Sequence, residues 1–314
     1  MNPVSRRHPK VSIGLPVYNG ERYLPAAIES LLGQTFRDFD LVICDNASTD
    51  GTEAICHHFM RIDPRIRYYR NSENLGATAN FNRTFELADG EYFKWAADDD
   101  LCAPDFLKRC VRILEKDTSL VLCHSEVKFI DENGEFLKTY DYSILPNIGS
   151  PEPHLRFADL IRTKHWCFDI FGLIRTNSLR QTPLIASYAA SDRTCLAALG
   201  LLGRFYRIPE YLFFSRDHSG RSIRKFPNPS YRTEWFDPNE RGRISFPYWR
   251  IFFEYIKTLN RVSLPLEQRL ACYSHLVKWL RKNYWRLKKD LRLGAKHTLI
   301  HVAGDILNLK KGSP

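Results

Sequence analysis

The chain has 314 residues, of which 44% are hydrophobic and 26% are charged, a composition typical of globular proteins that excludes wholesale disorder. No run of about 18 apolar residues occurs, so we expect no transmembrane helix, and the polar, basic first ten residues lack the apolar core of a signal peptide. The eight cysteines are scattered without a Cys-x-x-Cys pair, which favours buried, reduced thiols and a cytoplasmic protein.

The positive charge is concentrated at one end of the chain. Residues 250–314 contain 14 Lys and Arg against 4 Asp and Glu, whereas the other 249 residues carry 32 of each. The formal net charge of +10 therefore belongs to the C-terminal region. Nucleic-acid binding is a weak interpretation of this charge, because no recognised nucleic-acid motif accompanies it, and we expect no nucleic-acid partner.

In the first part of the chain, short apolar runs alternate with segments of helical period, which predicts an α/β sheet. We expect strands at residues 11–15, 41–44, 66–70 and 91–95. A polar loop follows each of these strands. In open α/β sheets the loops at the carboxyl ends of the strands bind the ligand. The sequence therefore predicts a ligand site along one edge of the sheet.

The second part continues the alternation less regularly. Asn133-Gly134, between the runs 120–130 and 135–137, is a strong hairpin signal. We expect an irregular insertion over 140–165, a strand over 170–175, a helix over 192–202, and two separate strands at 204–208 and 211–215. A segment rich in Gly, Pro, Asn and Arg then leads to the tail.

The basic tail contains one stripe of apolar residues at helical spacing. Its members are Leu266, Leu270, Tyr273, Val277, Leu280, Tyr284 and Leu287, and Gly294 predicts the end of the helix. In the preferred interpretation the stripe packs on the rest of the protein and leaves a charged face outside. In the alternative, this helix with Trp279 and Trp285 lies on an anionic membrane surface.

Asp98-Asp99-Asp100 is the most informative feature. Adjacent carboxylates repel one another unless solvent or a cation screens them, and a Mg²⁺ or Mn²⁺ ion held by one or two of them takes its other ligands from a diphosphate and water. The alternative is a solvated loop before the helix expected at Pro104. Asp45 ends the second strand, where it could bind a base or ribose, or cap the turn over 46–52. The chain has no G-x-G-x-x-G and no P-loop motif.

Four segments together resemble the family-2 glycosyltransferases of GT-A fold. They are V-S-I-G-L-P-V-Y-N at 11–19, D-N-A-S-T-D-G-T at 45–52, N-L-G at 74–76 and D-D-D-L-C-A-P at 98–104. The resemblance implies a nucleotide-binding mixed α/β sheet flanked by helices and joined to an acceptor half. It also implies inverting, Mn²⁺- or Mg²⁺-dependent transfer from a nucleotide diphosphate sugar, commonly UDP-linked, to a hydroxyl acceptor.

This resemblance predicts the organisation of the chain. We expect a glycosyltransferase domain at 1–220, with a nucleotide-sugar half near 10–115 and an acceptor half at 116–220, then a linker at 221–249 and a helical, basic region at 250–314. The chain lacks the Q-x-x-R-W motif that in the family accompanies processive polymerisation, which implies transfer of a single sugar. The usual setting of similar proteins implies a glycan or lipid-linked glycan acceptor in surface polysaccharide or glycolipid assembly. Peripheral contact with the inner face of a membrane through 250–314 stays an open alternative.

Site residues are carried over from the family by position. The resemblance implies nucleotide-sugar contacts from Pro16, Tyr18, Glu21, Asp45, Asn74 and Asp98, and metal ligation by Asp99, with Asp100 and His218 as further ligands. Arg216 and Arg221 would bind the diphosphate, although the stretch 216–221 also fits a solvated basic loop. Many members have Asp where this chain has Ala97, so the division of roles among the three aspartates stays open.

An inverting displacement also needs a base for the acceptor hydroxyl. The family places this carboxylate at the start of a helix in the second half, which makes Asp192 the candidate; the alternative is an ordinary helix-start Asp favoured by the helix dipole. Trp166 offers an aromatic face to an acceptor sugar, although an aromatic cluster here is also typical of a core. A non-catalytic sugar-nucleotide-binding module and a basic membrane-surface or nucleic-acid-binding protein are the remaining alternatives.

Overall fold

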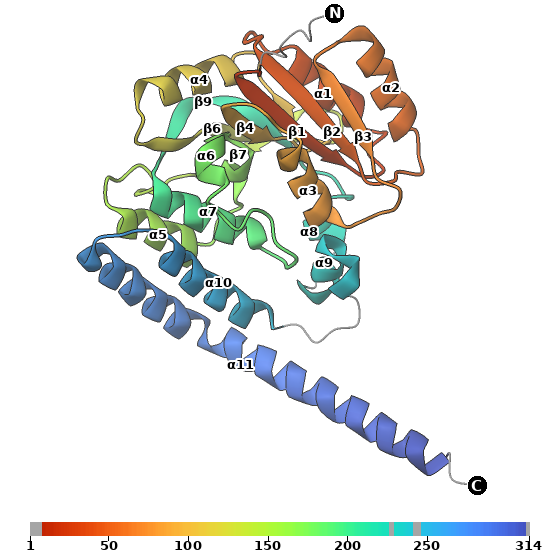
Figure 1. Ribbon diagram of the computed structural model, residues 1–314, viewed down its shortest axis with the longest axis vertical. Helices are drawn as coiled ribbons and strands as arrows, with labels where there is room; N and C mark the ends of the chain where they lie inside the picture. The colour runs from red at the N-terminus through yellow and green to blue at the C-terminus, as the bar shows by residue number, and fades with distance from the viewer. Residues whose placement is uncertain (1–7, 226–228, 241–245, 312–314) are drawn as a thin grey trace, which may run out of the picture.

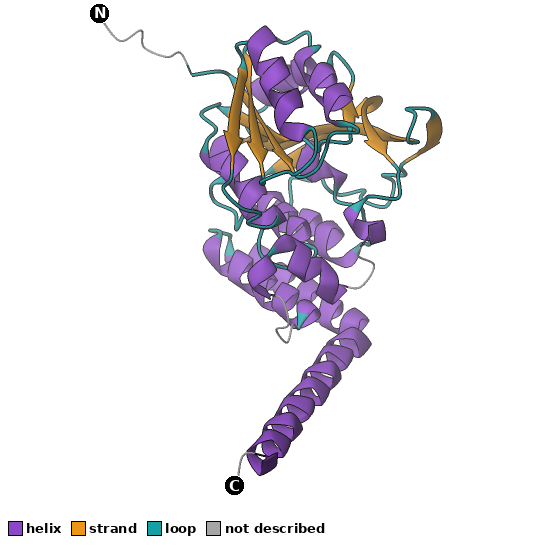
Figure 2. Ribbon diagram, turned by 90° about the vertical axis from the view of Figure 1, so that its right-hand side faces the viewer, coloured by secondary structure: helices purple, strands orange, loops and turns teal. Residues whose placement is uncertain are grey.

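The computed structural model describes residues 8–225, 229–240 and 246–311, and a mixed sheet of nine strands forms its upper part in the views of Figures 1 and 2. The strand order is β3-β2-β1-β4-β8-β6-β9-β5, and β7 pairs with β6. The strands are β1 (Val11–Val17), β2 (Phe39–Asp45), β3 (Ile66–Arg70), β4 (Tyr92–Trp95), β5 (Leu101–Cys102), β6 (Leu120–Ile130), β7 (Phe136–Thr139), β8 (Leu173–Arg175) and β9 (Arg204–Arg216).

The first four strands are mutually parallel and confirm the predicted α/β organisation. β2 and β4 flank β1, and β3 pairs with the outer side of β2. β1 and β2 are buried along their whole length, as expected for strands covered on both faces. The helices that follow β1, β2 and β3 are α1 (Leu24–Leu32), α2 (Thr52–Ile62) and α3 (Ala77–Glu86). All four predicted strands end within two residues of their expected bounds.

The second part of the sheet confirms the hairpin and joins two expected strands into one. β6 and β7 pair antiparallel, and Gly134 in their turn has φ 93°. β9 is continuous where we expected separate strands at 204–208 and 211–215. Its register against β6 jumps from Ile208 to Tyr211, so a bulge accommodates Pro209, which has no N–H to donate.

Two expectations for the acceptor half are wrong. The supposedly irregular stretch 140–165 contains helix α5 (Pro153–Arg162), because Pro153 suits a first turn and Phe157, Leu160 and Ile161 bury one face. The expected strand over 170–175 is shorter, since a 3₁₀ turn, η1 (Phe168–Phe171), occupies its first part. The other helices of this part are α4 (Phe106–Lys116), α6 (Thr176–Leu179) and α7 (Ser191–Leu202).

The region expected to be helical, 250–314, contains α10 (Pro247–Arg261) and α11 (Leu266–Lys311). The stretch 221–249, expected as a linker, also contains short helices: α8 (Ser222–Lys225), α9 (Pro229–Phe236) and the 3₁₀ turn η2 (Pro238–Glu240). α10 packs on α7 and α11, and α11 also packs on α5. Among these contacts, the buried ring of Tyr255 on α10 touches the rings of Phe157 on α5 and Trp279 on α11. Beyond this contact α11 projects from the body of the protein (Figures 1 and 2).

Helix α11 differs from its prediction in two ways. It continues through Gly294 to Lys311, since one interior glycine costs only about 1 kcal/mol of helix stability. The preferred packing of the apolar stripe holds only in part: Leu287 is buried and Tyr273 and Leu280 pack partly buried against the core, whereas the other four members are exposed. A neighbouring face, which includes Cys272, Leu276 and Trp279, is buried against the rest of the protein.

Two sequence expectations about the whole chain can be compared with this fold. All eight cysteines are buried free thiols, as expected. Within the described residues, none of the helices combines the length and apolar content that crossing a membrane requires.

Candidate active site

The loops after β1 and β2 are joined by hydrogen bonds at the carboxyl edge of the sheet. The backbone N–H of Asn19 donates to Ser48 Oγ at 2.9 Å, and that of Gly20 donates to Thr52 Oγ1 at 2.9 Å. Glu21, a predicted nucleotide contact, uses one carboxylate oxygen within the protein: its Oε2 accepts from the Gly51 N–H in the loop after β2 at 2.7 Å. Pro16 lies within buried β1, and the half-exposed ring of Tyr18 follows it at the edge.

Asp45 lies fully buried below this junction. Its Oδ1 accepts from the Ser48 N–H at 2.9 Å, and its Oδ2 accepts from the Tyr68 hydroxyl at 2.8 Å. Burial, followed by the bond to Asp45, raises the pKa of Tyr68. Both carboxylate oxygens are therefore engaged within the protein, as the turn-capping alternative predicts. Direct contact between Asp45 and a nucleobase stays a prediction.

An asparagine network connects the same edge to the loop before α3. The side chain of Asn46 donates to Asn74 Oδ1 at 2.7 Å and accepts from the Leu75 N–H at 3.0 Å. Asn71 donates to Asn46, and Asn80 donates to the carbonyl oxygens of Val17 and Cys44. The predicted contact residue Asn74 is thus exposed at a rim that buried amides hold in place.

The three aspartates after β4 have different surroundings. Asp98 lies against Gly20, where a Cβ would come within 2.5 Å of its Oδ2. Asp99 Oδ2 lies 2.8 Å from His218 Nε2, and Asp100 Oδ1 accepts from the Arg216 N–H at 2.8 Å. Burial and repulsion from Asp99 raise the pKa values of Asp98 and Asp100 above the usual range of a carboxyl group. A divalent cation at this run would offset that repulsion.

The two arginines predicted to bind a diphosphate are placed differently. Arg216 is buried, and its guanidinium donates to the backbone carbonyls of Asp99, Asp131 and Glu132 at 3.0 to 3.1 Å. It therefore holds the aspartate run against the β6–β7 turn through its Nε and Nη1 donors. Nη1 of Arg221 is buried without a hydrogen-bond partner among the described residues, 3.9 Å from Asp217 Oδ1. Within that part of the chain, Arg221 Nη1 is thus a donor without a hydrogen-bond partner, which a phosphate oxygen could use.

Trp166 connects this loop to the acceptor half. Its side chain is 48% exposed, the Arg221 guanidinium lies 5.5 Å from its ring centre, and the Phe168 ring stacks on it. Asp192, in the first turn of α7, lies beside Cys167: burial and this carboxylate raise the pKa of the Cys167 thiol. Since Cys167 follows Trp166 directly, the predicted base and the predicted acceptor contact are neighbours.

The contacts form a continuous series from Asp45 to Asp192. It passes through Ser48 and the β1 loop to Asp98, from Asp99 to His218, and from Arg221 to Trp166. Positive backbone φ angles occur at Asn19, Ala47, Cys167 and Ala190, next to or within these segments. Such conformations cost energy in non-glycine residues and cluster at functional sites.

The donor set fits a divalent ion only if the substrate supplies most of its ligands. Among the described residues, no group of three or more His, Cys, Asp or Glu side chains is arranged to hold a metal ion. One carboxylate and one imidazole, from Asp99 and His218, do meet at 2.8 Å. Carboxylate and imidazole together suit Mn²⁺, and a diphosphate and water would complete its shell. Asp100, a predicted ligand, has one oxygen bound to the Arg216 N–H instead.

Several residues of the site were missed by sequence reasoning. The Tyr23 ring lies 4.8 Å from the His218 ring and 4.9 Å from the Arg216 guanidinium, so it supports both. The Tyr140 hydroxyl accepts from the Trp166 N–H at 3.2 Å. No motif marks either tyrosine, because each acts through contacts with residues far away in the sequence. Asn46 lay within a predicted loop, and its burial could have been suspected from the apolar strand before it.

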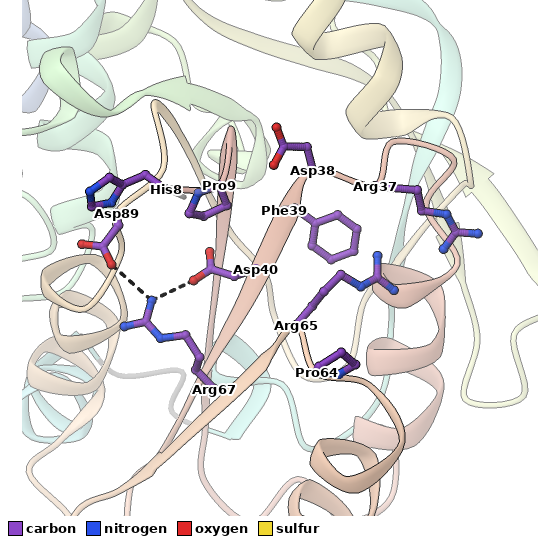
Figure 3. Close-up of a pocket in the computed structure, with 10 residues that line it drawn as sticks. All are labelled: His8, Pro9, Arg37, Asp38, Phe39, Asp40, Pro64, Arg65, Arg67 and Asp89. Carbon is purple, nitrogen blue, oxygen red and sulfur yellow. Dashed lines mark hydrogen bonds and ion pairs between the residues drawn. The ribbon is translucent and has the colours of Figure 1, made fainter. Parts of the chain in front are cut away.

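A cavity of about 340 Å³ lies elsewhere, at the amino ends of β2 and β3 (Figure 3). Three of its charged residues pair with one another: Arg67 Nη1 lies 2.7 Å from Asp40 Oδ2 and 3.5 Å from Asp89 Oδ2. None of the predicted site residues lines it. This cavity is therefore separate from the candidate site at the carboxyl edge.

Comparison with known proteins identifies a family for this chain. Residues 12–185 match the family model described as Glycosyl transferase family 2. An uncharacterized glycosyltransferase of Methanocaldococcus jannaschii is 35% identical over 134 residues, which cover 42% of this chain and 46% of that protein. The putative glycosyltransferase EpsH of Bacillus subtilis is 32% identical over 228 residues, covering 71% and 60%. The chain thus spans about half to three fifths of the length of these two relatives.

Solved structures share the fold at low sequence identity. TarS residues 1–349 of S. aureus, in complex with UDP, superposes with a TM-score of 0.62 at 16% identity, covering 88% of this chain and 72% of that one. The mannosyltransferase PcManGT of Pyrobaculum calidifontis, in complex with GDP-Man and Mn²⁺, has a TM-score of 0.55 at 16% identity and covers 97% and 81%.

Proposed function

The chain belongs to glycosyl transferase family 2, and from this membership we propose that it transfers one sugar from a UDP-linked donor to a hydroxyl of a glycan or lipid-linked glycan, with inversion and with Mn²⁺ or Mg²⁺. It is a glycosyltransferase with a GT-A-type mixed sheet flanked by helices. The donor, the metal, the stereochemistry and a role in surface polysaccharide or glycolipid assembly are parts of the proposal. The observation that carries it is the continuous series of contacts from Asp45 to Asp192.

The donor would lie along the first half of this series. We assign its nucleoside to the edge formed by Tyr18, Asp45 and Asn74, and its diphosphate to the space between Asp99 and Arg221. UDP and UDP-GlcNAc are bound in TarS structures, whereas GDP-Man is bound in PcManGT, so the folds alone accommodate either base. We prefer UDP because the resemblance of the four sequence motifs to the family implies a donor that is commonly UDP-linked.

A divalent cation, when bound by Asp99 and His218, would supply positive charge next to the diphosphate. Arg221 adds a second cation there, through its Nη1 donor, which has no hydrogen-bond partner among the described residues. Arg216 and Tyr23 hold the aspartate run and the imidazole in position, which reduces reorganisation during the reaction.

The acceptor would lie against Trp166, within reach of Asp192. In the proposed step the Asp192 carboxylate takes the hydroxyl proton while the acceptor oxygen forms a bond to the anomeric carbon. The bond from that carbon to the phosphate oxygen breaks on the opposite face, and the nucleoside diphosphate leaves with the bonding electrons. A single in-line displacement of this kind inverts the anomeric centre.

A panel of UDP-, GDP- and dTDP-sugars with Mn²⁺ or Mg²⁺, scored by release of nucleoside diphosphate, tests the proposal without a known acceptor. We expect turnover with a UDP-sugar, lost on chelation and reduced at least about 100-fold in Asp99→Asn. Asp38→Asn, an exposed carboxylate at the opposite sheet edge, is the matched control and should keep full turnover.

Two results would contradict parts of the proposal. Full activity of Asp99→Asn would show that Asp99 is not a required metal ligand. Turnover with GDP-sugars alone would show that the donor is GDP-linked and not UDP-linked. Asp192→Asn should abolish transfer to an acceptor found by such screening while donor binding remains, because the base contacts only the acceptor. An equal loss of donor binding in that variant would contradict the assigned role.

A further inference from the structure

Helix α11 has its inner face fixed by specific contacts. Trp279 is buried against the Tyr255 ring, Asp290 Oδ2 accepts from the Tyr248 N–H at 2.7 Å, and the Trp249 indole donates to the Leu287 carbonyl at 3.1 Å. Turning the helix about its axis would break all of these contacts. The exposed sides of the helix are therefore held away from the protein.

Beside the inner face, on an exposed flank of the helix, α11 carries a row of large apolar side chains, which we call the outer stripe: Leu270, Val277, Tyr284 and Leu291. They recur every seventh residue, so they lie on one line along the helix, and each is 46% to 59% exposed. Trp285 beside them is 72% exposed. Contiguous exposed apolar surface of this kind usually marks a site of interaction.

Basic side chains accompany the outer stripe. Lys278, Arg281 and Arg292 are exposed, and Lys288 Nζ lies 5.3 Å from the centre of the Trp285 ring. The region from 250 to 314 as a whole carries a net charge of +10. Two copies of this face brought together would place like charges side by side. A negatively charged surface with an apolar layer beneath it matches both features.

We propose that the outer stripe docks on the surface of a membrane that contains anionic phospholipids. The helix would lie in the plane of the interface, with Val277 and Leu291 in the acyl boundary and Tyr284 and Trp285 at the level of the headgroups. Lys278, Arg281 and Lys288 would contact lipid phosphates. This inference goes beyond the proposed sugar transfer and does not depend on it.

Co-sedimentation of the full chain with vesicles tests the proposal. We expect binding to vesicles of phosphatidylcholine mixed with phosphatidylglycerol, little binding to phosphatidylcholine alone, and weaker binding at higher salt. The double variant Val277→Glu/Trp285→Glu should bind at least about tenfold more weakly. The matched control is Ile62→Glu on α2, which places the same charge at a side chain 62% exposed and should bind normally.

The other outcomes overturn the proposal. Equal sedimentation with both vesicle types, or unchanged binding of the double variant, would exclude recognition of anionic lipid by the outer stripe. A wild-type dimer in analytical ultracentrifugation, dissolved by Val277→Glu/Trp285→Glu and without vesicle binding, would assign the stripe to self-association. Because the stripe is remote from the aspartate run, donor turnover of the double variant without vesicles should equal that of the wild type.

Discussion

Alanine substitution should have different consequences at Arg216, the last residue of β9, and at Arg221, which follows the strand. Arg216→Ala removes a buried guanidinium that three carbonyls accept from, so we expect a loss of about 3 kcal/mol in unfolding free energy. Arg221→Ala removes a group with an unused donor, so stability should change by less than about 1 kcal/mol while donor turnover falls about 100-fold. Urea denaturation and nucleoside diphosphate release measure both. Similar stability losses in the two variants would contradict the distinction.

Asp169 predicts a dependence of stability on pH. It is buried in η1, and burial raises the pKa of its carboxyl from 3.8 to about 6. Below pH 3.8 the folded and unfolded forms are both protonated. Between these two pKa values only the unfolded form ionises readily, so unfolding free energy falls as pH rises, by about 3 kcal/mol in total, and then stays level.

Replacing the Asp169 carboxyl by an amide should remove this decline of unfolding free energy with rising pH. Asp169→Asn is expected to flatten the fall in unfolding free energy between pH 4 and 6, measured by urea denaturation at several pH values. Asp141→Asn, at an exposed carboxylate, is the control and should keep the wild-type slope. The same slope in both variants would show that Asp169 ionises freely in the fold.

At the scale of elements, the segment from α9 to η2 depends on Gly76. This glycine precedes α3 with φ 86°, and a Cβ there would come within 2.6 Å of the Phe236 carbonyl oxygen. Gly76→Ala should therefore displace the segment, lower unfolding free energy by about 1–2 kcal/mol and speed proteolysis within residues 229–240. Gly149→Ala, whose Cβ would lie an ordinary 3.4 Å from the Phe205 oxygen, should do neither. Equal proteolysis of the two variants would contradict this role.

The elements also show which parts of the fold a sequence can predict. β1 to β4 followed from apolar runs because burial on both faces leaves a local signal. The bulge at Pro209 and the helix α5 did not, since each depends on a partner elsewhere in the chain. The site divides in the same way: acidic and polar loops at strand ends were visible, whereas the placement of Arg216 and Tyr23 depends on tertiary contacts.

At the scale of the whole molecule, α11 contacts the rest of the protein through one face only. Trp279→Ala should cost about 3–5 kcal/mol of unfolding free energy, because the ring fills the contact with Tyr255. Trp285→Ala, on the same helix but largely exposed, should cost less than about 0.5 kcal/mol. Thermal and urea denaturation of the pair measure this. Equal costs would mean that α11 packs differently.

The burial of all eight native thiols makes the chain suitable for site-directed labelling. Burial raises the pKa values of Cys44, Cys56, Cys195 and Cys272 to about 12, so these sulfurs hardly form the reactive thiolate at neutral pH. A cysteine introduced at an exposed position, such as Val277→Cys, would react with a maleimide or a nitroxide reagent while the native cysteines stay in place. Paramagnetic probes along α11 could then report its immersion depth residue by residue in the otherwise natural sequence.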